Sequence, residues 1–202
     1  MKKSIILFCS LMTLVLAGCG SKQVATSEKK VEKVESQALA ERKPATRAWG
    51  EGTNFKQSVA RAMAENQARG AFQRQIETKV RTGIEDVNQG DNLWGSDTHE
   101  SEQATNQGST LDYITTSVSK GTLNNTAVIN TDTYRTKDGQ YHVYVCIEYQ
   151  GEVGEMAANM AQSYKNVVKQ RVSDADHKKM EERARAFEER MNNLLNEENK
   201  EK

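Results

Sequence analysis

The chain has 202 residues, with 28 basic and 28 acidic side chains, so its formal net charge is zero. Without a basic excess it lacks the electrostatic footprint of a nucleic-acid-binding protein, and we exclude a nucleic-acid partner. Hydrophobic residues make up 36% of the chain and are frequent in its first 18 residues, so the rest is polar and suits one domain with tails.

The N-terminus combines a short basic start with a short apolar run. Lys2 and Lys3 precede residues 4–16, which are almost entirely apolar but fewer than the roughly 20 residues that span a bilayer. Small residues follow, in the order that is typical of a secretory signal peptide and its cleavage site. We therefore predict a signal peptide over residues 1–18.

Cys19 closes the stretch Leu-Ala-Gly-Cys, which resembles the lipobox of bacterial lipoproteins. The resemblance implies that diacylglycerol is attached to the Cys19 thiol, that the chain is cut before this residue, and that the new amine is acylated. Several acyl chains, at about 0.8 kcal/mol per buried CH₂, hold a protein firmly at a membrane. Gly20 stands where an aspartate marks inner-membrane retention in some bacteria, which favours the outer membrane. The alternatives are a signal peptide cut elsewhere and an uncut anchor.

Beyond Cys19, the composition predicts a tether and then a small domain. Residues 19–43 are rich in Lys and Glu, which is typical of a flexible lipidated tether, and Pro44 ends it. Residues 44–150 are predicted to form a small α+β domain. Its fold is a three-stranded antiparallel sheet covered by a long alanine-rich helix.

Local patterns place the elements of this domain. Strands are expected at 45–52, 126–135 and 141–149, with Asp138-Gly139 at the tip of a hairpin. The helix is expected to begin at Phe55, with alanines in one sector that allows a close approach to the sheet: Ala60, Ala64, Ala68 and Ala71. Residues 88–110 are predicted to form a long loop, and residues 111–120 a short helix.

One face of the strand at 141–149 is a candidate binding face. His142, Tyr144, Cys146 and Glu148 alternate on it, and Trp94 lies in the predicted loop as a core-edge residue or a further contact. His142 and Cys146 are about 13 Å apart along the strand at ~3.3 Å per residue, too far for a nucleophile and its base. No Cys/His cluster has metal-ligand spacing. We predict no enzymatic activity, no metal and no cofactor.

Residues 151–202 are predicted to be a C-terminal helical region. Apolar residues recur there at spacings of three and four, in a stripe that includes Met180, Phe187, Met191 and Leu194. Two alternatives stay open: the stripe folds back onto the domain, or it pairs with a protein partner or a second copy of the chain.

Three stretches together resemble a known family: the Trp-Gly-Glu-Gly end of the first strand, the helix from Ala60 to Ala68, and the Tyr-His-Val-Tyr-Val hairpin strand. They are similar to the LPP-twenty family of small envelope lipoproteins. The resemblance spans about residues 45–150 and implies a non-enzymatic α+β domain in outer-membrane assembly. The C-terminal helices and the 88–110 segment depart from it. We expect a membrane-anchored envelope lipoprotein that acts as an interaction module, with binding of a small ligand or cell-wall polymer as the alternative.

Overall fold

The structure is a computed structural model that describes residues 34–87, 100–169 and 177–200. Five helices and three strands follow one another in these ranges: α1 (Glu35–Arg42), β1 (Arg47–Asn54), α2 (Gln57–Val87), α3 (Glu100–Leu123), β2 (Thr126–Arg135), β3 (Tyr141–Tyr149), α4 (Val153–Lys169) and α5 (His177–Lys200). The predicted α+β class is confirmed.

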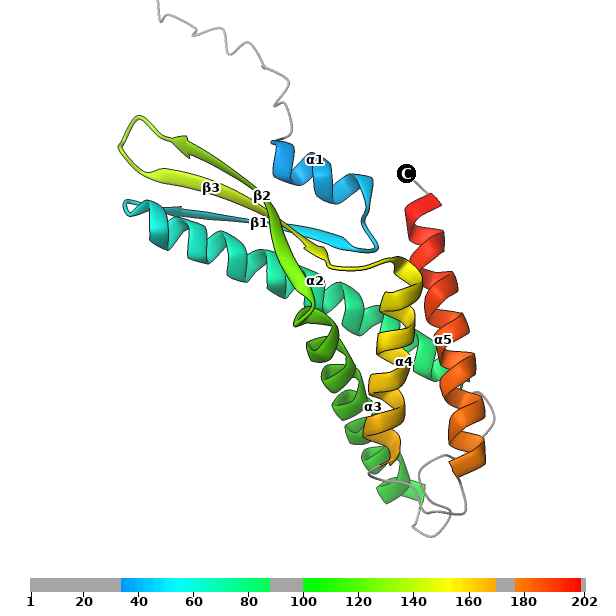
Figure 1. The fold of residues 1–202 in the computed structure, drawn as a ribbon. Helices are drawn as coiled ribbons and strands as arrows, with labels where there is room; N and C mark the ends of the chain where they lie inside the picture. Colours follow the sequence, from blue (N-terminus) through cyan, green and yellow to red (C-terminus); the bar gives the residue numbers. More distant parts are fainter. Residues whose placement is uncertain (1–33, 88–99, 170–176, 201–202) are drawn as a thin grey trace, which may run out of the picture. The chain divides into compact units, whose positions relative to one another are not determined.

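The three strands form one antiparallel sheet in the order β1-β3-β2. β3 is central, and the turn at 136–140 joins it to β2, with Gly139 at a φ of 87°. The pairing shifts between Val128 and Asn130, a bulge that increases the local twist of β2. The predicted hairpin and the three-stranded sheet are therefore both confirmed (Figure 1).

The long helix α2 covers one face of this sheet, which we call the inner face (Figure 1). Ala60, Ala64 and Ala68 are fully buried, and they pack where β1 carries Gly50 and Gly52. A Cβ on Gly52 would lie 2.7 Å from the Ala64 nitrogen. The predicted close approach of the alanine-rich helix is confirmed. From β3, the inner face adds the buried side chains of Val143, Val145, Ile147 and Tyr149.

The C-terminal half of α2 packs against other helices. Gly83 faces α5 so closely that a Cβ there would lie 3.0 Å from both Phe187 Cε2 and Met191 Sδ. Arg81 pairs with Asp112 of α3. In Figure 1, α3, α4 and α5 gather beside this half of α2. One hydrophobic cluster joins them to the sheet.

Two predictions are corrected here. Residues 35–42 of the predicted tether form α1, whose buried Ser36 and Ala40 pack on the sheet. The predicted loop over 88–110 gives way to α3 from residue 100 onward; this polar stretch lacks apolar periodicity, although its Glu, Gln and Ala residues form helices well. The predicted C-terminal helical region forms α4 and α5, and its apolar side chains belong to the same core as the sheet.

Candidate functional site

The candidate site is the face of the sheet opposite α2, which we call the outer face. In the observed register, Tyr144 of β3 lies between Glu51 of β1 and Asp132 of β2. His142 of β3 has Tyr134 of β2 as its neighbour. Directly opposed residues of antiparallel strands project to the same side, so these five side chains share the outer face.

Four rings form a connected group on this face. The ring centroid of Tyr144 lies 4.8 Å from that of His142, which stacks on it at 29°. Trp49 is 6.3 Å from Tyr144 on one side, and Tyr134 meets it edge-on at 6.1 Å on the other. Trp49, His142 and Tyr144 are partly exposed and Tyr134 is 50% exposed. These ring contacts join Trp49, Tyr134, His142 and Tyr144 into one aromatic surface, which we call the aromatic patch.

Polar groups border the aromatic patch. Glu51 Oε2 lies 3.6 Å from His142 Nε2. Burial raises the pKa of Tyr144, and the nearby charges of Glu51 and Tyr134 raise it further. Its hydroxyl therefore keeps its proton well above neutral pH and can donate a hydrogen bond to a partner.

Helix α1 covers the rest of the outer face. The Ser36 backbone nitrogen donates to Asp132 Oδ2 at 2.8 Å, and the Ser36 hydroxyl donates to the Tyr144 carbonyl at 3.4 Å. Asn130 Nδ2 donates to the same Ser36 hydroxyl at 3.0 Å. These bonds hold α1 on the sheet beside the aromatic patch.

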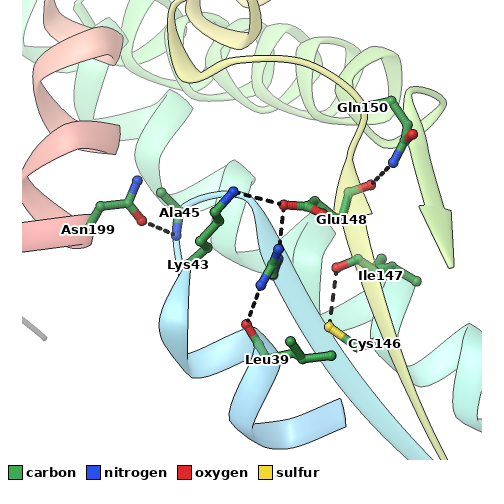
Figure 2. A network of polar contacts seen from close by, with 9 residues as sticks. Leu39, Lys43, Ala45, Cys146, Ile147, Glu148, Gln150 and Asn199 are labelled. Carbon is green, nitrogen blue, oxygen red and sulfur yellow. Dashed lines mark hydrogen bonds and ion pairs between the residues drawn. The ribbon is translucent and has the colours of Figure 1, made fainter. Parts of the chain in front are cut away.

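Cys146 and Glu148 belong to the part of the outer face where the chain packs on itself. Glu148 Oε1 accepts a hydrogen bond from Arg47 Nε at 2.9 Å and lies 3.6 Å from Lys43 Nζ (Figure 2). Cys146 is fully buried, and burial is the main cause that raises the pKa of its thiol to about 11. Glu148, predicted for the binding face, thus forms an internal ion pair, and the Cys146 thiol stays protonated at neutral pH.

A second exposed apolar group lies at the end of the sheet where β1 stops and β2 turns into β3. We call this the distal end; there Asn54 pairs with Tyr141. Phe55 is 67% exposed, Val59 40% and Met63 48%. Val59 and Met63, four residues apart, lie on one side of α2, and Phe55 comes just before the helix. We call these three residues the apolar row.

The predicted partner stripe on the last helix lies in the core instead. Phe187 and Met191 are fully buried, and Met180 is nearly so. The Phe187 ring stacks on Tyr164 of α4 with centroids 4.9 Å apart. Leu194 is only partly buried, and Leu195 occupies the core position in its place. Of the two alternatives, the structure supports folding back onto the domain, because α4 and Gly83 of α2 provide the complementary surface.

Two predicted site residues, Cys19 and Trp94, lie outside the described residues. Within 34–87, 100–169 and 177–200, no group of three or more His, Cys, Asp or Glu side chains is arranged to hold a metal ion. The helices in these ranges also include none that is long and apolar enough to cross a membrane.

The site residues predicted from the sequence did not include Trp49, Tyr134 or the apolar row. In β1, Gly50 and Gly52 face α2, so the residues that alternate with these glycines, Trp49 among them, lie on the other face of the sheet. This alternation was the sequence signal that could have identified Trp49. The place of Tyr134 beside His142 could be predicted only from the register between β2 and β3, and this register follows from the hairpin turn. Phe55 and Met63 lay within the predicted helix, for which only the sector of alanines was assigned a contact with the sheet.

Comparisons with family models, with curated proteins and with solved structures find no match for this chain.

Proposed function

We propose that the protein is a lipid-anchored, non-catalytic interaction module of the bacterial cell envelope that binds a protein partner at the distal end of its sheet. Two exposed groups carry the proposal: the aromatic patch on the outer face of the sheet, and the apolar row on the α2 side of the sheet. Phe55 and Tyr134 are at least half exposed at this end. Exposed apolar side chains that gather in one group are typical of interaction sites, and aromatic residues are enriched in the centres of protein interfaces.

The chemistry of the patch favours a partner that presents a basic side chain, above all arginine. The partly exposed ring of Trp49 and the exposed ring of Tyr134 can attract a cation over their faces. The Glu51 carboxylate, 46% exposed, offers an acceptor beside them. A guanidinium stacks on aromatic faces and also pairs with carboxylates. An arginine-bearing partner segment therefore fits this surface better than an acidic one.

The membrane anchor of the proposal rests on the Leu-Ala-Gly-Cys stretch that ends at Cys19. Because α1 begins at Glu35, residues 20–34 are what links this cysteine to the first helix. We expect a clickable palmitate analogue to label the chain in bacterial cells and the chain to fractionate with membranes. Cys19→Ala should lose both the label and the membrane association. A label that persists in this variant would contradict the anchor.

Photo-crosslinking in intact cells tests the interaction surface. A photoreactive residue at Tyr134 or Phe55 should give one discrete adduct with another protein. The control probe at Glu188, exposed on α5, should give none. Glu51→Lys should weaken the Tyr134 adduct, since it places a cation beside the incoming arginine. Equal adducts at all three probes, or an adduct at Glu188 alone, would contradict the proposed surface.

A second candidate function is binding of a cell-wall polymer by the same rings, and the partly exposed rings of Trp49 and Tyr144 favour it. Sugar rings stack on aromatic faces much as other apolar groups do. The test is co-sedimentation with insoluble cell wall. Wall binding that Trp49→Ala abolishes, without any protein adduct at Tyr134, would replace the protein partner with the polymer.

A further inference from the structure

A pocket lies between the C-terminal end of α3 and α4, away from the aromatic patch. It is open to solvent and has a volume of about 320 Å³, near the lower limit of the about 300–1,000 Å³ that is typical of small-molecule sites. Its lining is Gly121, Thr122, Asn124, Asn125, Tyr149, Asn159, Gln162 and Ser163. Not one of these side chains carries a charge at neutral pH.

The Tyr149 hydroxyl indicates that this pocket can bind a polar group. Its side chain is only 2% exposed, and its hydroxyl oxygen accepts two hydrogen bonds, from Asn159 Nδ2 at 2.8 Å and from Asn125 Nδ2 at 3.3 Å. A phenol also has one hydrogen to donate. Among the described residues no hydrogen bond is found that this hydroxyl donates, so its hydrogen can serve a group bound in the pocket.

The surrounding chain holds this hydroxyl in place. The Gln150 backbone nitrogen donates to the Asn125 carbonyl at 2.8 Å, and the Asn125 nitrogen donates to the Thr122 carbonyl at 3.1 Å. The turn that carries Asn125 is thereby fixed to the end of β3. These backbone bonds fix the turn, and the side-chain amides of Asn125 and Asn159 hold the hydroxyl.

Other polar side chains of the lining also have hydrogen-bonding groups that the described residues leave unused. The side chains of Asn124 and Ser163 form no hydrogen bond with the described residues, and Gln162 uses its amide nitrogen on Asn166 at 3.0 Å, which leaves its carbonyl oxygen as an acceptor. The pocket thus presents donors and acceptors together, without a charge to pair with an ion. A charged ligand would find no counter-charge, and an apolar ligand would leave these groups unsatisfied.

We propose that this pocket binds a neutral saccharide of one or two rings, with a sugar hydroxyl or acetamido oxygen accepting the Tyr149 hydrogen. Sugar hydroxyls each donate and accept, which matches a lining of amides and hydroxyls. This inference does not rest on the protein-partner function, because it uses no residue of the aromatic patch or the apolar row.

The test is titration of the isotope-labelled full chain, in a detergent without sugar head groups, with N-acetylglucosamine and with glucose. We expect at least one of them to bind with a Kd on the order of 1 mM and to shift the side-chain amide signals of Asn124, Asn125 and Asn159. Tyr149→Phe keeps the ring and removes the donor, so it should weaken binding about fivefold. Positively charged glucosamine and negatively charged glucuronate should bind more weakly than the neutral sugars.

Two further variants keep the result interpretable. Gly121→Ala adds a methyl 3.5 Å from the Ser163 hydroxyl, an ordinary contact distance that preserves the fold while narrowing the pocket, and it should also weaken binding. Asn193→Ala, an exposed asparagine on α5, and Trp49→Ala in the aromatic patch should leave sugar binding unchanged. The absence of saturable shifts with both neutral sugars, or binding that neither Tyr149→Phe nor Gly121→Ala weakens, would overturn the proposal.

Discussion

Gly50 of β1 and Ala64 of α2 meet with no space for a side chain between them. A Cβ placed on Gly50 would lie 2.5 Å from the Ala64 carbonyl oxygen and 2.8 Å from the Gln67 carbonyl carbon. Both atoms belong to the helix backbone, which cannot move aside as a flexible side chain would. The strand and the helix are therefore in direct backbone contact, and this contact positions the sheet that carries the aromatic patch.

Gly50→Ala should lower the free energy of unfolding by about 3 kcal/mol, because the added methyl overpacks a rigid contact. The measurement is urea denaturation followed by circular dichroism. Gly70→Ala is the matched control, since the nearest atom to its new methyl would be Arg74 Nη1 at 3.4 Å. In the interior of α2 this control should gain about 0.5–1 kcal/mol. Equal stability of Gly50→Ala and the wild type would contradict the backbone contact.

Phe187→Ala should lower the free energy of unfolding by about 4 kcal/mol, as expected for deletion of a buried aromatic ring. The ring is fully buried between Tyr164 and the α2 surface around Gly83. The exposed neighbour Glu188 provides the control, and Glu188→Ala should change stability by less than about 0.5 kcal/mol. If Phe187→Ala were as stable as the control, the stripe would be free for a partner, as the alternative interpretation of the sequence allowed.

The sheet and its covering helix could be predicted because their signals are local. Val143, Val145 and Ile147 alternate with polar neighbours, and the Asp138-Gly139 turn joins two such runs. The fold of α1 could not be predicted in this way. Its anchoring bond joins Ser36 to Asp132, 96 residues further along the chain, so residues 35–42 show only a polar composition until the sheet exists to receive them.

In the candidate site, too, some features follow from local signals and others depend on contacts between distant parts of the chain. Tyr144 and His142 were found from the alternation within one strand, but their grouping with Trp49 and Tyr134 depends on the register between strands. The apolar stripe on α5 could not be assigned from sequence for another reason. A row that packs in the chain's own core and a row that binds a partner have the same spacing, and only the presence of α4 and Gly83 decides between them.

The Arg47–Glu148 ion pair should contribute more to stability than a surface pair of equal length. Both pairs have a charged contact of 2.9 Å, but Arg47 and Glu148 are 13% and 20% exposed, whereas Lys165 and Glu181 are 33% and 54% exposed. A double-mutant cycle with alanine at both positions should give a coupling energy of about 1–2 kcal/mol for the first pair. The same cycle on the second pair should give about 0.5 kcal/mol or less. A larger coupling at the surface pair would contradict the assignment of Glu148 to an internal role.

Cys146 should make stability depend on pH in the alkaline range. Burial raises the pKa of its thiol from 9.0 to about 11, with Glu148 and Asp132 adding to the rise and Arg47 opposing it. Between these two values the folded state keeps a proton that the unfolded state releases, so the free energy of unfolding falls as pH rises through this range. Cys146→Ala lacks this thiol. The difference in stability between wild type and variant should therefore be constant below pH 9 and should then shift against the wild type.

Urea denaturation of both proteins at several pH values measures this difference in stability. The other titrating groups are the same in both proteins, so their contribution to the pH dependence cancels in the difference. The control is Ser58→Cys in the Cys146→Ala background, where the new thiol is exposed on α2. An exposed thiol has similar pKa values in the folded and unfolded states, so this control should follow Cys146→Ala at every pH. A wild-type protein that also follows Cys146→Ala up to pH 11 would show that the Cys146 thiol ionises as freely in the folded state as in the unfolded chain, contrary to its burial.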